Sequence, residues 1–252
     1  MVGRIIRTGQ TFSADLPILI NYDYRRILDQ ILALPSLRAF YDFSDPTKIT
    51  KDGSNLVGQV LDLGPNALHL TASSGDPPTY AEGAMNSVPA VQFNGSNKLT
   101  NANLFSGSMR LTVSATLYAT GADGTSRIFL GDGNTNNANF YTNQSFFFAM
   151  GGNASQAVSG IKTSIKHYLA TMNDVTDRVT VRSGLAAPTV GALTYSRPSG
   201  SGNVGAWNDA VTTNRYNGYI GHLAILDEDV NANAAVTSLL HEYCVRRYRT
   251  AM

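Results

Sequence analysis

The sequence contains a single cysteine, Cys244, and a single tryptophan, Trp207, among its 252 residues. One cysteine cannot form an intrachain disulfide, and the apolar, helical pattern around it favours a buried and unreactive thiol. Charge is also scarce, because only 15% of the residues are charged and 19 basic residues nearly balance 18 acidic ones. The chain therefore lacks the basic excess that nucleic acid attracts, and we expect no nucleic-acid partner.

Long apolar runs are missing as well. No stretch of the sequence reaches the roughly 18 apolar residues that a membrane helix needs, so we expect no membrane insertion. The N-terminal residues MVGRIIRTGQTFSADLPILI contain neither a continuous apolar segment nor a small-residue cleavage site, which predicts that the chain has no Sec signal peptide. We expect a soluble protein that would reach the outside of a cell by another route.

The sequence is rich in the alternation of apolar and polar residues that marks β-strands. In PAVQFNGSNKL, residues 89–99, Val91 and Phe93 share one strand face, and the Asn-Gly pair that follows tolerates the positive φ of a tight turn. In MRLTVSATLYAT, residues 109–120, every second residue from the first leucine is apolar. Such strand and turn signals recur roughly every ten residues over residues 39–226. The pattern predicts an all-β, antiparallel sandwich or barrel.

The N-terminal part of the chain has a different pattern. Residues 1–20 form an arm in which RIIRTGQTF and LPILI are each predicted to be short extended segments. Residues 21–34 place apolar side chains at helical spacing, and Pro35 ends the predicted helix. We therefore divide the chain into residues 1–36, an arm and helix for anchoring or oligomerisation, and residues 37–252, the β domain. The residues expected to make the assembly contact are Tyr24, Ile27, Leu28 and Ile31.

A second predicted helix closes the chain. NANAAVTSLLHEYCVRRYRT, residues 231–250, carries one apolar stripe, and Arg246, Arg247 and Arg249 lie in its last turns. Basic residues at that position complement the negative end of the helix dipole. A basic site for a partner is the alternative interpretation.

Catalytic groups are sparse in the sequence. Glycoside hydrolysis needs two carboxylates that face each other across the scissile bond, and no strand carries such a pair. Asp227, Glu228 and Asp229 have the right chemistry but lie at a strand-to-helix turn, where Asp229 is predicted to cap a helix. No Gly-x-Ser-x-Gly elbow is present, and His69 and His222 lie in strand patterns that favour satisfied core positions. We therefore expect that the chain is not an enzyme.

A calcium site is one interpretation of the stretch GDGNTNNANF. It offers Asp132, Asn134 and Asn136 at alternate positions, and Ca²⁺ prefers such oxygen ligands. Because Ca²⁺ usually takes more than one carboxylate, a hydrated, asparagine-rich loop is the alternative.

Carbohydrate binding needs an aromatic face that packs against a sugar ring and planar polar groups that bond its hydroxyls. Two asparagine-rich stretches offer both, one around Trp207 and one around Tyr141. The alternative is that Trp207 fills the core and both loops are merely solvated. The predicted sugar-binding residues are Trp207, Asn208, Asp209, Arg215, Tyr216, Asn139 and Tyr141.

Four segments in order resemble the concanavalin A-like lectin/glucanase superfamily, in its laminin G-like branch. They are LRAFYDFSD, VLDLGPNALHLTA, PAVQFNGSNKLT and YNGYIGHLAILDEDVNANAAVTSLLHEYCVRRY. The third resembles a Phe-Asp-Gly strand of the family, with Asn94 where Asp is common. The resemblance covers residues 37–249 and implies a jelly-roll β-sandwich, with a Ca²⁺ often bound at the rim.

The resemblance also implies a biological setting. Laminin G-like domains occur in bacterial surface proteins and in phage tail or head-spike proteins, and an appended arm would suit a virion-attached module. We therefore expect a homo-oligomeric, non-catalytic protein on the surface of a virion or phage-like particle. It would bind cell-surface polysaccharide and contact other particle proteins through the arm. A structural decoration or connector protein without a glycan site is the first alternative, and a glycoside hydrolase is the second.

Overall fold

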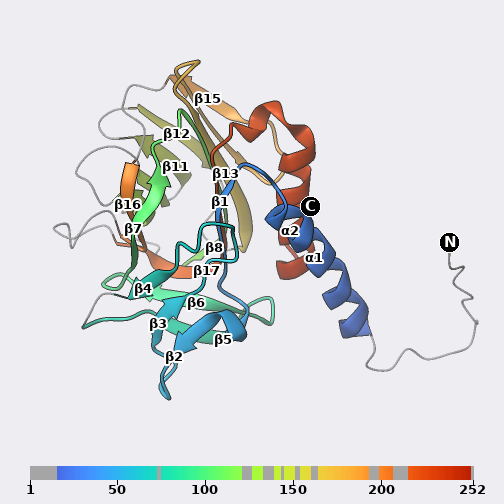
Figure 1. Ribbon diagram of the computed structural model, residues 1–252, viewed down its shortest axis with the longest axis vertical. Helices are drawn as coiled ribbons and strands as arrows, with labels where there is room; N and C mark the ends of the chain where they lie inside the picture. Colours follow the sequence, from blue (N-terminus) through green and yellow to red (C-terminus); the bar gives the residue numbers. More distant parts are fainter. Residues whose placement is uncertain are drawn as a thin grey trace, which may run out of the picture.

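The computed structural model describes residues 16–72, 75–120, 127–132, 139–142, 145–150, 154–159, 164–192, 199–206 and 215–250. Two antiparallel β-sheets stack face to face, and two helices lie against one of them, as Figure 1 shows. We call the sheet that packs against the helices the central sheet. The sheet on its opposite face is the outer sheet. The expected all-β sandwich with N- and C-terminal helices is thereby confirmed.

Within the described residues the central sheet has eight strands. In spatial order they are β15 (Thr189–Ala192), β14 (Arg178–Ser183), β13 (Lys166–Asn173), β8 (Arg110–Ala119), β17 (Asn217–Leu226), β6 (Val88–Asn94) and β5 (Thr79–Met85), and β1 (Leu37–Asp42) also pairs with β17.

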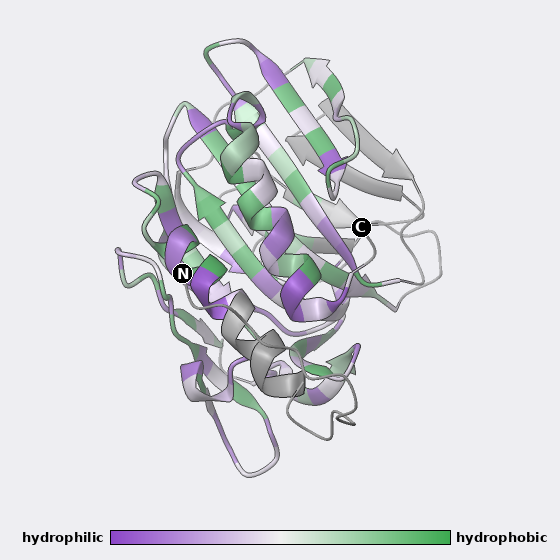
Figure 2. Cartoon of the chain, turned by 90° about the vertical axis from the view of Figure 1, so that its right-hand side faces the viewer, coloured by the Kyte–Doolittle hydropathy of each residue, from purple (hydrophilic) through white to green (hydrophobic). Residues whose placement is uncertain are grey.

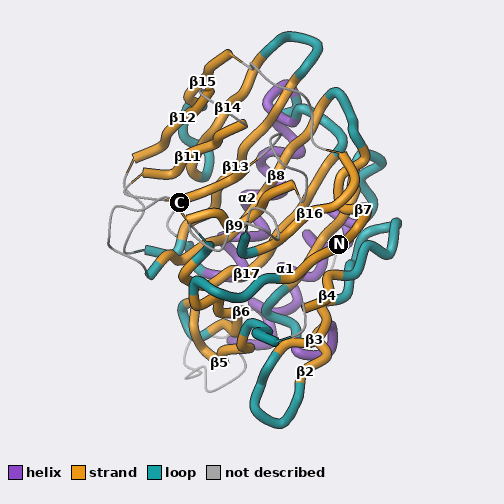
Figure 3. Tube along the Cα trace, turned by 90° about the vertical axis from the view of Figure 1, so that its left-hand side faces the viewer, coloured by secondary structure: helices purple, strands orange, loops and turns teal. Residues whose placement is uncertain are grey.

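The outer sheet, seen from its side of the molecule in Figure 3, has nine strands in the same described part of the chain. They are β12 (Ala154–Ser159), β11 (Ser145–Met150), β10 (Asn139–Thr142), β9 (Arg127–Asp132), β16 (Ser199–Val204), β7 (Leu99–Ser106), β4 (Leu70–Ala72), β3 (Val57–Val60) and β2 (Ile49–Lys51). The helical elements are α1 (Leu16–Leu32), α2 (Ala234–Tyr248) and the short 3-10 turns η1 (Pro46–Lys48) and η2 (Val230–Ala232).

The middle strands of the central sheet are buried on both faces. Its inner face packs on the outer sheet through residues such as Val113 and Leu117 of β8, which are 1–2% exposed. Its other face is covered by α2, which crosses the strands in Figure 2. There Ser114 and Thr116 of β8 have no exposed surface. Alternation in β8 therefore separates an apolar buried face from a hydroxyl-bearing buried face.

The N-terminal helix is longer than the sequence predicted. Residues 16–20, expected to be extended, form the first turns of α1. Proline is tolerated there because the first amides of a helix have no intrahelical acceptor, and Pro17 is the second helical residue. The helix ends at Leu32, before Pro35, as predicted. None of the described helices is long and apolar enough to cross a membrane.

The apolar face of α1 packs on the chain's own α2. Tyr24, Ile27 and Ile31 are 8%, 4% and 0% exposed and share one core cluster with Leu240 and Tyr243. Leu28 lies beside the cluster, partly buried. The side chains proposed for assembly are thus covered inside this chain. A role for residues 1–36 in oligomerisation stays a prediction.

The tight turn predicted after Phe93 is present and connects the two sheets. The strand β6 of the central sheet ends at Asn94, Gly95 has φ +91°, and β7 of the outer sheet follows. The Oδ1 atom of Asn94 accepts from the amide of Ser96 at 2.9 Å, and the amide of Asn94 donates to Asn97 Oδ1 at 3.1 Å. These side-chain hydrogen bonds stabilise the turn, although the two strands that it connects belong to different sheets and do not pair with each other.

Candidate functional site

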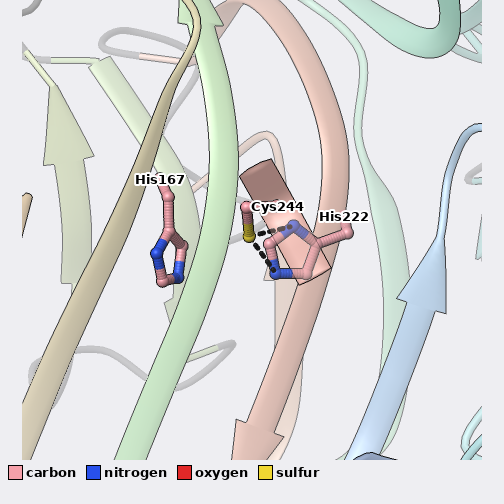
Figure 4. Close-up of side chains that lie close together, drawn as sticks. All are labelled: His167, His222 and Cys244. Atoms are coloured by element: carbon pink, nitrogen blue, oxygen red, sulfur yellow. Dashed lines mark hydrogen bonds between the residues drawn. The ribbon is translucent and has the colours of Figure 1, made fainter. Parts of the chain in front are cut away.

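Three histidines and a cysteine gather beneath α2. The strands β13 and β17 flank β8, and their alternation places His167 and His222 on the face that α2 covers. His241 and Cys244 reach the same place from α2, where they are three residues apart and so lie on one helix face. Figure 4 shows β8 passing between His167 and the pair formed by Cys244 and His222. We call this group the histidine network.

Hydrogen bonds join the network into one chain. His241 Nδ1 lies 3.2 Å from His167 Nδ1, and His167 Nε2 lies 2.8 Å from Ser114 Oγ. Ser114 Oγ is also 3.2 Å from His222 Nε2, and His222 Nδ1 is 2.9 Å from Thr116 Oγ1. Each imidazole can carry one proton and each hydroxyl can donate once, so neutral groups satisfy every bond.

Burial keeps the network uncharged. Desolvation lowers the pKa of His222 to about 3, and it lowers the pKa of His167 well below its usual value, with further repulsion from His222, His241 and Arg182. Burial also lowers the pKa of His241 and raises the pKa of the Cys244 thiol far above its usual value. The buried thiol predicted from the sequence is therefore confirmed, and its lack of reactivity stays a prediction.

The ligand-type atoms of His167, His222 and Cys244 lie within 4.8 Å of one another. The thiol, however, is 3.8 Å from both ring nitrogens of His222, which places it over the ring face instead of along a nitrogen lone pair. Both nitrogens already bond hydroxyl groups. This geometry is that of a satisfied polar core and not of a tetrahedral metal site, in which each nitrogen points at the ion.

Ser114 and His167 also resemble a nucleophile and its base. A Ser–His pair at 2.8 Å, with His241 behind the base, has the connectivity of a hydrolytic triad. Ser114 is fully buried, though, and it does not line the neighbouring cavity. The hydroxyl is therefore out of reach of a substrate in this structure.

A groove opens beside the histidine network. Its volume is about 1210 Å³, and it lies between α2 and the β13–β14 hairpin. One stripe of α2 forms a wall, with residues at spacings of three and four, and the stretch Ser183–Ala186 contributes to the opposite side. His167 and His241 reach its floor. We call it the α2 groove, and this wall consists of Ser238, His241, Glu242, Val245 and Arg246 of α2 together with its C-cap residue Arg249.

The α2 groove contains an aromatic side chain and several hydroxyls. Tyr118, at the end of β8, lines it while half-buried and stacks on Tyr219 of β17, with ring centroids 5.9 Å apart and planes at 17°. Register places the two tyrosines opposite each other across the strands. Ser164, Ser183 and Ser238 add hydroxyl groups to the lining. An aromatic face beside polar groups is the combination that a sugar ring requires.

Charge in the groove is mostly positive. Lys166, Arg246 and Arg249 line it together with one carboxylate, Glu242. Arg246 Nη2 lies 3.1 Å from Glu242 Oε1, one helical turn away, and both side chains are nearly half exposed. Water therefore screens this pair strongly.

Tyr216 corrects one prediction for the sugar site. Its side chain has no exposed surface and packs edge-to-face on Phe93 and Phe129 at 6.1 and 6.3 Å between centroids. It is a core residue and does not face a ligand in this structure. Arg215, beside it, donates a hydrogen bond to the carbonyl of Ser96. A sequence pattern of mixed asparagine and aromatic residues does not distinguish an aromatic that turns inward from one that turns outward.

The other predicted loop residues are placed only in part. Trp207, Asn208, Asp209, Asn134 and Asn136 lie outside the described residues. Asn139 and Tyr141 belong to β10, which pairs with β9 and β11. Asp132 ends β9, pairs through its main chain with Gly202 and is fully buried, so it does not lie on an exposed loop. A Ca²⁺ site built on it stays a prediction.

The acidic turn after β17 is structural. Asp229 caps η2 by accepting from the amide of Asn231 at 3.1 Å, which confirms the predicted capping role. The longer α2 is capped by Asn233. Asp227 accepts from Ser106 Oγ at 2.6 Å, and Glu228 accepts from Ser36 Oγ at 2.7 Å. These bonds fasten the turn to the neighbouring loops.

Neither the histidine network nor the α2 groove was predicted from the sequence. One signal was available, because Ser114 and Thr116 alternate with the apolar residues of β8 and His222 lies in an otherwise apolar strand. Serine and threonine are small, however, and alternation with hydroxyl residues is also the pattern of a solvated sheet face, so this signal did not show that a helix covers it. The sequence did not show that α2 would cover this face only partly.

A scan against models of known protein families and a search of curated proteins found no match. Solved structures do share the fold. A mutant sialidase of Trypanosoma rangeli that displays trans-sialidase activity aligns with a TM-score of 0.60 at 10% identity, over 94% of this chain. This chain spans 40% of that sialidase chain. A Trypanosoma rangeli sialidase in complex with sialic acid aligns similarly, with a TM-score of 0.58 at 11% identity, over 90% of this chain and 39% of that one.

Domain 4 of an extracellular GH43 arabinanase from Geobacillus stearothermophilus, in complex with arabinotriose, aligns over nearly its whole length. The TM-score is 0.53 at 16% identity, and the alignment covers 82% of this chain and 98% of that domain. At these identities the likeness shows the fold alone. The fold is a β-sandwich that occurs in carbohydrate-active proteins.

These neighbours correct one expectation. The sequence led us to expect that the chain is not an enzyme, and the neighbours contradict this because they come from glycoside hydrolases of several kinds.

Proposed function

We propose that this chain recognises carbohydrate and that the glycan binds in the α2 groove. The observation that carries the proposal is Tyr118, a half-buried aromatic side chain that lines a groove rich in hydroxyl groups. Its stack on Tyr219 holds the ring in place, so little conformational freedom is lost when a sugar packs against it. The arabinotriose complex of a domain with the same fold supports the class of ligand.

The proposal is tested by titrating the full chain with a panel of neutral and acidic oligosaccharides, arabinotriose included, in a calorimeter. We expect Tyr118→Ala to weaken binding about tenfold, since an aromatic contact contributes on the order of 1 kcal/mol. The matched variant Tyr118→Phe keeps the ring and should retain most of the affinity. Unchanged affinity in Tyr118→Ala would move the site elsewhere, and no binding across the panel would refute the function.

Glycoside hydrolysis is the second candidate, and the enzymes that supply the neighbouring folds favour it. Among the described residues that line the groove, Glu242 alone carries a carboxylate, whereas the reaction usually employs two. Release of reducing ends from arabinan or of sialic acid from a sialoside would show hydrolysis directly. If Glu242→Gln abolished that release, the groove would be the active site.

Attachment of a phage-like particle to cell-surface polysaccharide is the finer form of the proposal. Its support is the resemblance of four sequence segments and the N-terminal helix that precedes the sandwich. Shallow sugar sites bind weakly, so such a protein would act in several copies. Loss of cell binding after enzymatic removal of the capsule, with a structurally intact protein, is the expected result.

A further inference from the structure

The α2 groove concentrates positive charge in a chain that is nearly neutral. The whole sequence has 19 basic and 18 acidic residues, yet the groove is lined by Lys166, Arg246 and Arg249 against Glu242. Of all the acidic residues, this one alone belongs to the lining that the structure describes. A neutral ligand would gain nothing from such a distribution, whereas an anion would be attracted by it.

The single carboxylate is already engaged. Glu242 lies beside Arg246, one helical turn away at 3.1 Å, so one cation of the lining is matched by this carboxylate. Lys166 and Arg249 remain as the excess cations of the lining. Burial lowers the pKa of the two histidines of the floor, so they do not add to the positive charge of the groove.

Charged groups also lie behind the lining of the groove. Arg182 of β14 lies close enough to repel a proton from His167, and its guanidinium bonds the side-chain oxygen of Asn231. Asp229 attracts Arg182 and offsets part of its charge. The carboxyl end of α2 contributes a partial negative charge, which Arg246 and Arg247 complement from the last turn. Arg247 points away from the groove toward Ser44, so it does not add to the excess.

We infer that the glycan of the α2 groove is acidic, with carboxylate or sulfate groups that Arg249 and Lys166 contact while Tyr118 packs on a sugar ring. This inference rests on the proposed function and names its class of ligand. An arginine can bond a carboxylate or a sulfate through two parallel N–H groups, which gives geometric selectivity as well as attraction. The tyrosine and the serine hydroxyls favour a sugar polymer over other polyanions.

The first experiment compares ligands that differ only in charge. An oligogalacturonate and its methyl-esterified form share rings and linkages, and a sulfated galactan has a desulfated counterpart. We expect the acidic form of at least one pair to bind about tenfold or more tightly than its neutral form, with an advantage that shrinks as salt rises from 50 to 300 mM, conditions chosen to span a large change in screening. The two pairs distinguish carboxylate from sulfate recognition.

Single substitutions then test whether the charged residues of the α2 groove cause the preference for the acidic ligand. Arg249→Gln should weaken binding of the acidic ligand about tenfold and leave the neutral ligand unchanged, while Glu242→Gln should strengthen binding of the acidic ligand. The matched control is Arg178→Gln, an exposed arginine of β14 that does not line the groove. All three positions are exposed, so the fold should tolerate the changes.

The outcomes separate this inference from the proposed function. Equal affinity for the acidic and neutral forms, or a loss in Arg178→Gln as large as in Arg249→Gln, would overturn the acidic ligand while carbohydrate binding stands. Equally tight binding of polyphosphate, a polyanion without sugar rings, would also overturn it. Failure to bind every oligosaccharide would refute carbohydrate recognition itself.

Discussion

His222 shows how burial sets the chemistry of a single residue here. It has no exposed surface, and both of its ring nitrogens bond hydroxyl groups that can serve a neutral ring fully. Burial removes the water that would solvate a protonated ring, which is why the pKa of His222 falls to about 3. Stability must then depend on pH, because the unfolded chain keeps an ordinary histidine.

The sign of this dependence follows from proton counting. Between pH 6.5 and pH 3 the unfolded state binds a proton at His222 that the folded state does not bind. The contribution of His222 to the free energy of unfolding is therefore complete above this pH range and is lost as the pH falls through it. From pH 7 to pH 5 the loss is about 2 kcal/mol for one such histidine. Urea unfolding at both pH values should show this loss in the native chain and a correspondingly smaller loss in His222→Gln.

A matched control is available in the same chain. His69 lies outside the network, half-buried, where its Nδ1 accepts from the amide of Asp62 at 3.1 Å. We expect His69→Gln to keep the pH dependence that His222→Gln reduces. Because His222→Gln lowers stability at every pH, the carbon-bound proton shifts of the His222 ring provide a second measurement. A ring that titrated near pH 6.5 in the folded protein would contradict the argument.

At the scale of elements, α1 is held by α2 through aromatic and apolar contacts. Tyr24 meets Tyr243 edge-to-face at 6.2 Å, and the guanidinium of Arg247 lies 4.5 Å above the Tyr24 ring. Ile31 is fully buried in the same cluster. We expect Ile31→Ala to lower the free energy of unfolding by about 2–5 kcal/mol, since it leaves a cavity between the two helices and the sheet.

Calorimetric or urea unfolding measures this change, and Arg26→Ala, on the exposed face of α1, is the control with an expected effect within about 0.5 kcal/mol. The oligomeric mass is determined on the same samples. If Ile31→Ala changed the mass of the assembly and left the stability of the single chain untouched, the face would serve another subunit, contrary to the packing described.

Elements also show what the sequence could and could not predict. Strands such as β8 and β6 were predictable because alternation is a local property of the chain. The strands β2, β5 and β15 have a weaker local signal, since β2 and β15 have three and four residues and β5 contains Glu82-Gly83 with a register shift. The sequence predicts an extended segment around Pro17, where the structure has the first turn of a helix. Proline is found both in the first turn of a helix and just after its end, so it does not by itself distinguish the two.

The candidate site was less predictable than the fold. Its parts come from β8, β13, β14 and α2, which are far apart in the sequence and meet only through packing. Tyr216 illustrates the limit, because an aromatic beside asparagines turned inward onto Phe93. Residues that are distant in the sequence can be placed side by side only when the order of strands in the sheet is known. Here β13 and β17 both flank β8, which brings His167 and His222 together.

At the scale of the whole molecule, the central sheet organises stability. The strands β8 and β17 are covered on one face by the outer sheet and on the other by helices, and each has neighbouring strands on both sides. The edge strand β2 pairs with β3 alone among the described strands, and part of it is exposed. Amides of a doubly covered strand exchange with solvent only when most of the fold opens, whereas edge amides exchange through local opening.

Hydrogen exchange followed by mass spectrometry should therefore rank the strands by position. We expect peptides that cover residues 111–119 and 220–226 to exchange at least about a hundredfold more slowly than a peptide that covers residues 49–60. Saturating glycan in the α2 groove should slow exchange in α2 and β13 further, because a ligand that binds only the folded state stabilises the elements it joins. If residues 49–60 were protected as strongly as β8, the two sheets would open as one unit and the central sheet would have no special role. If protection by ligand appeared in the outer sheet and not in α2, the glycan would bind on the opposite side of the sandwich from the groove.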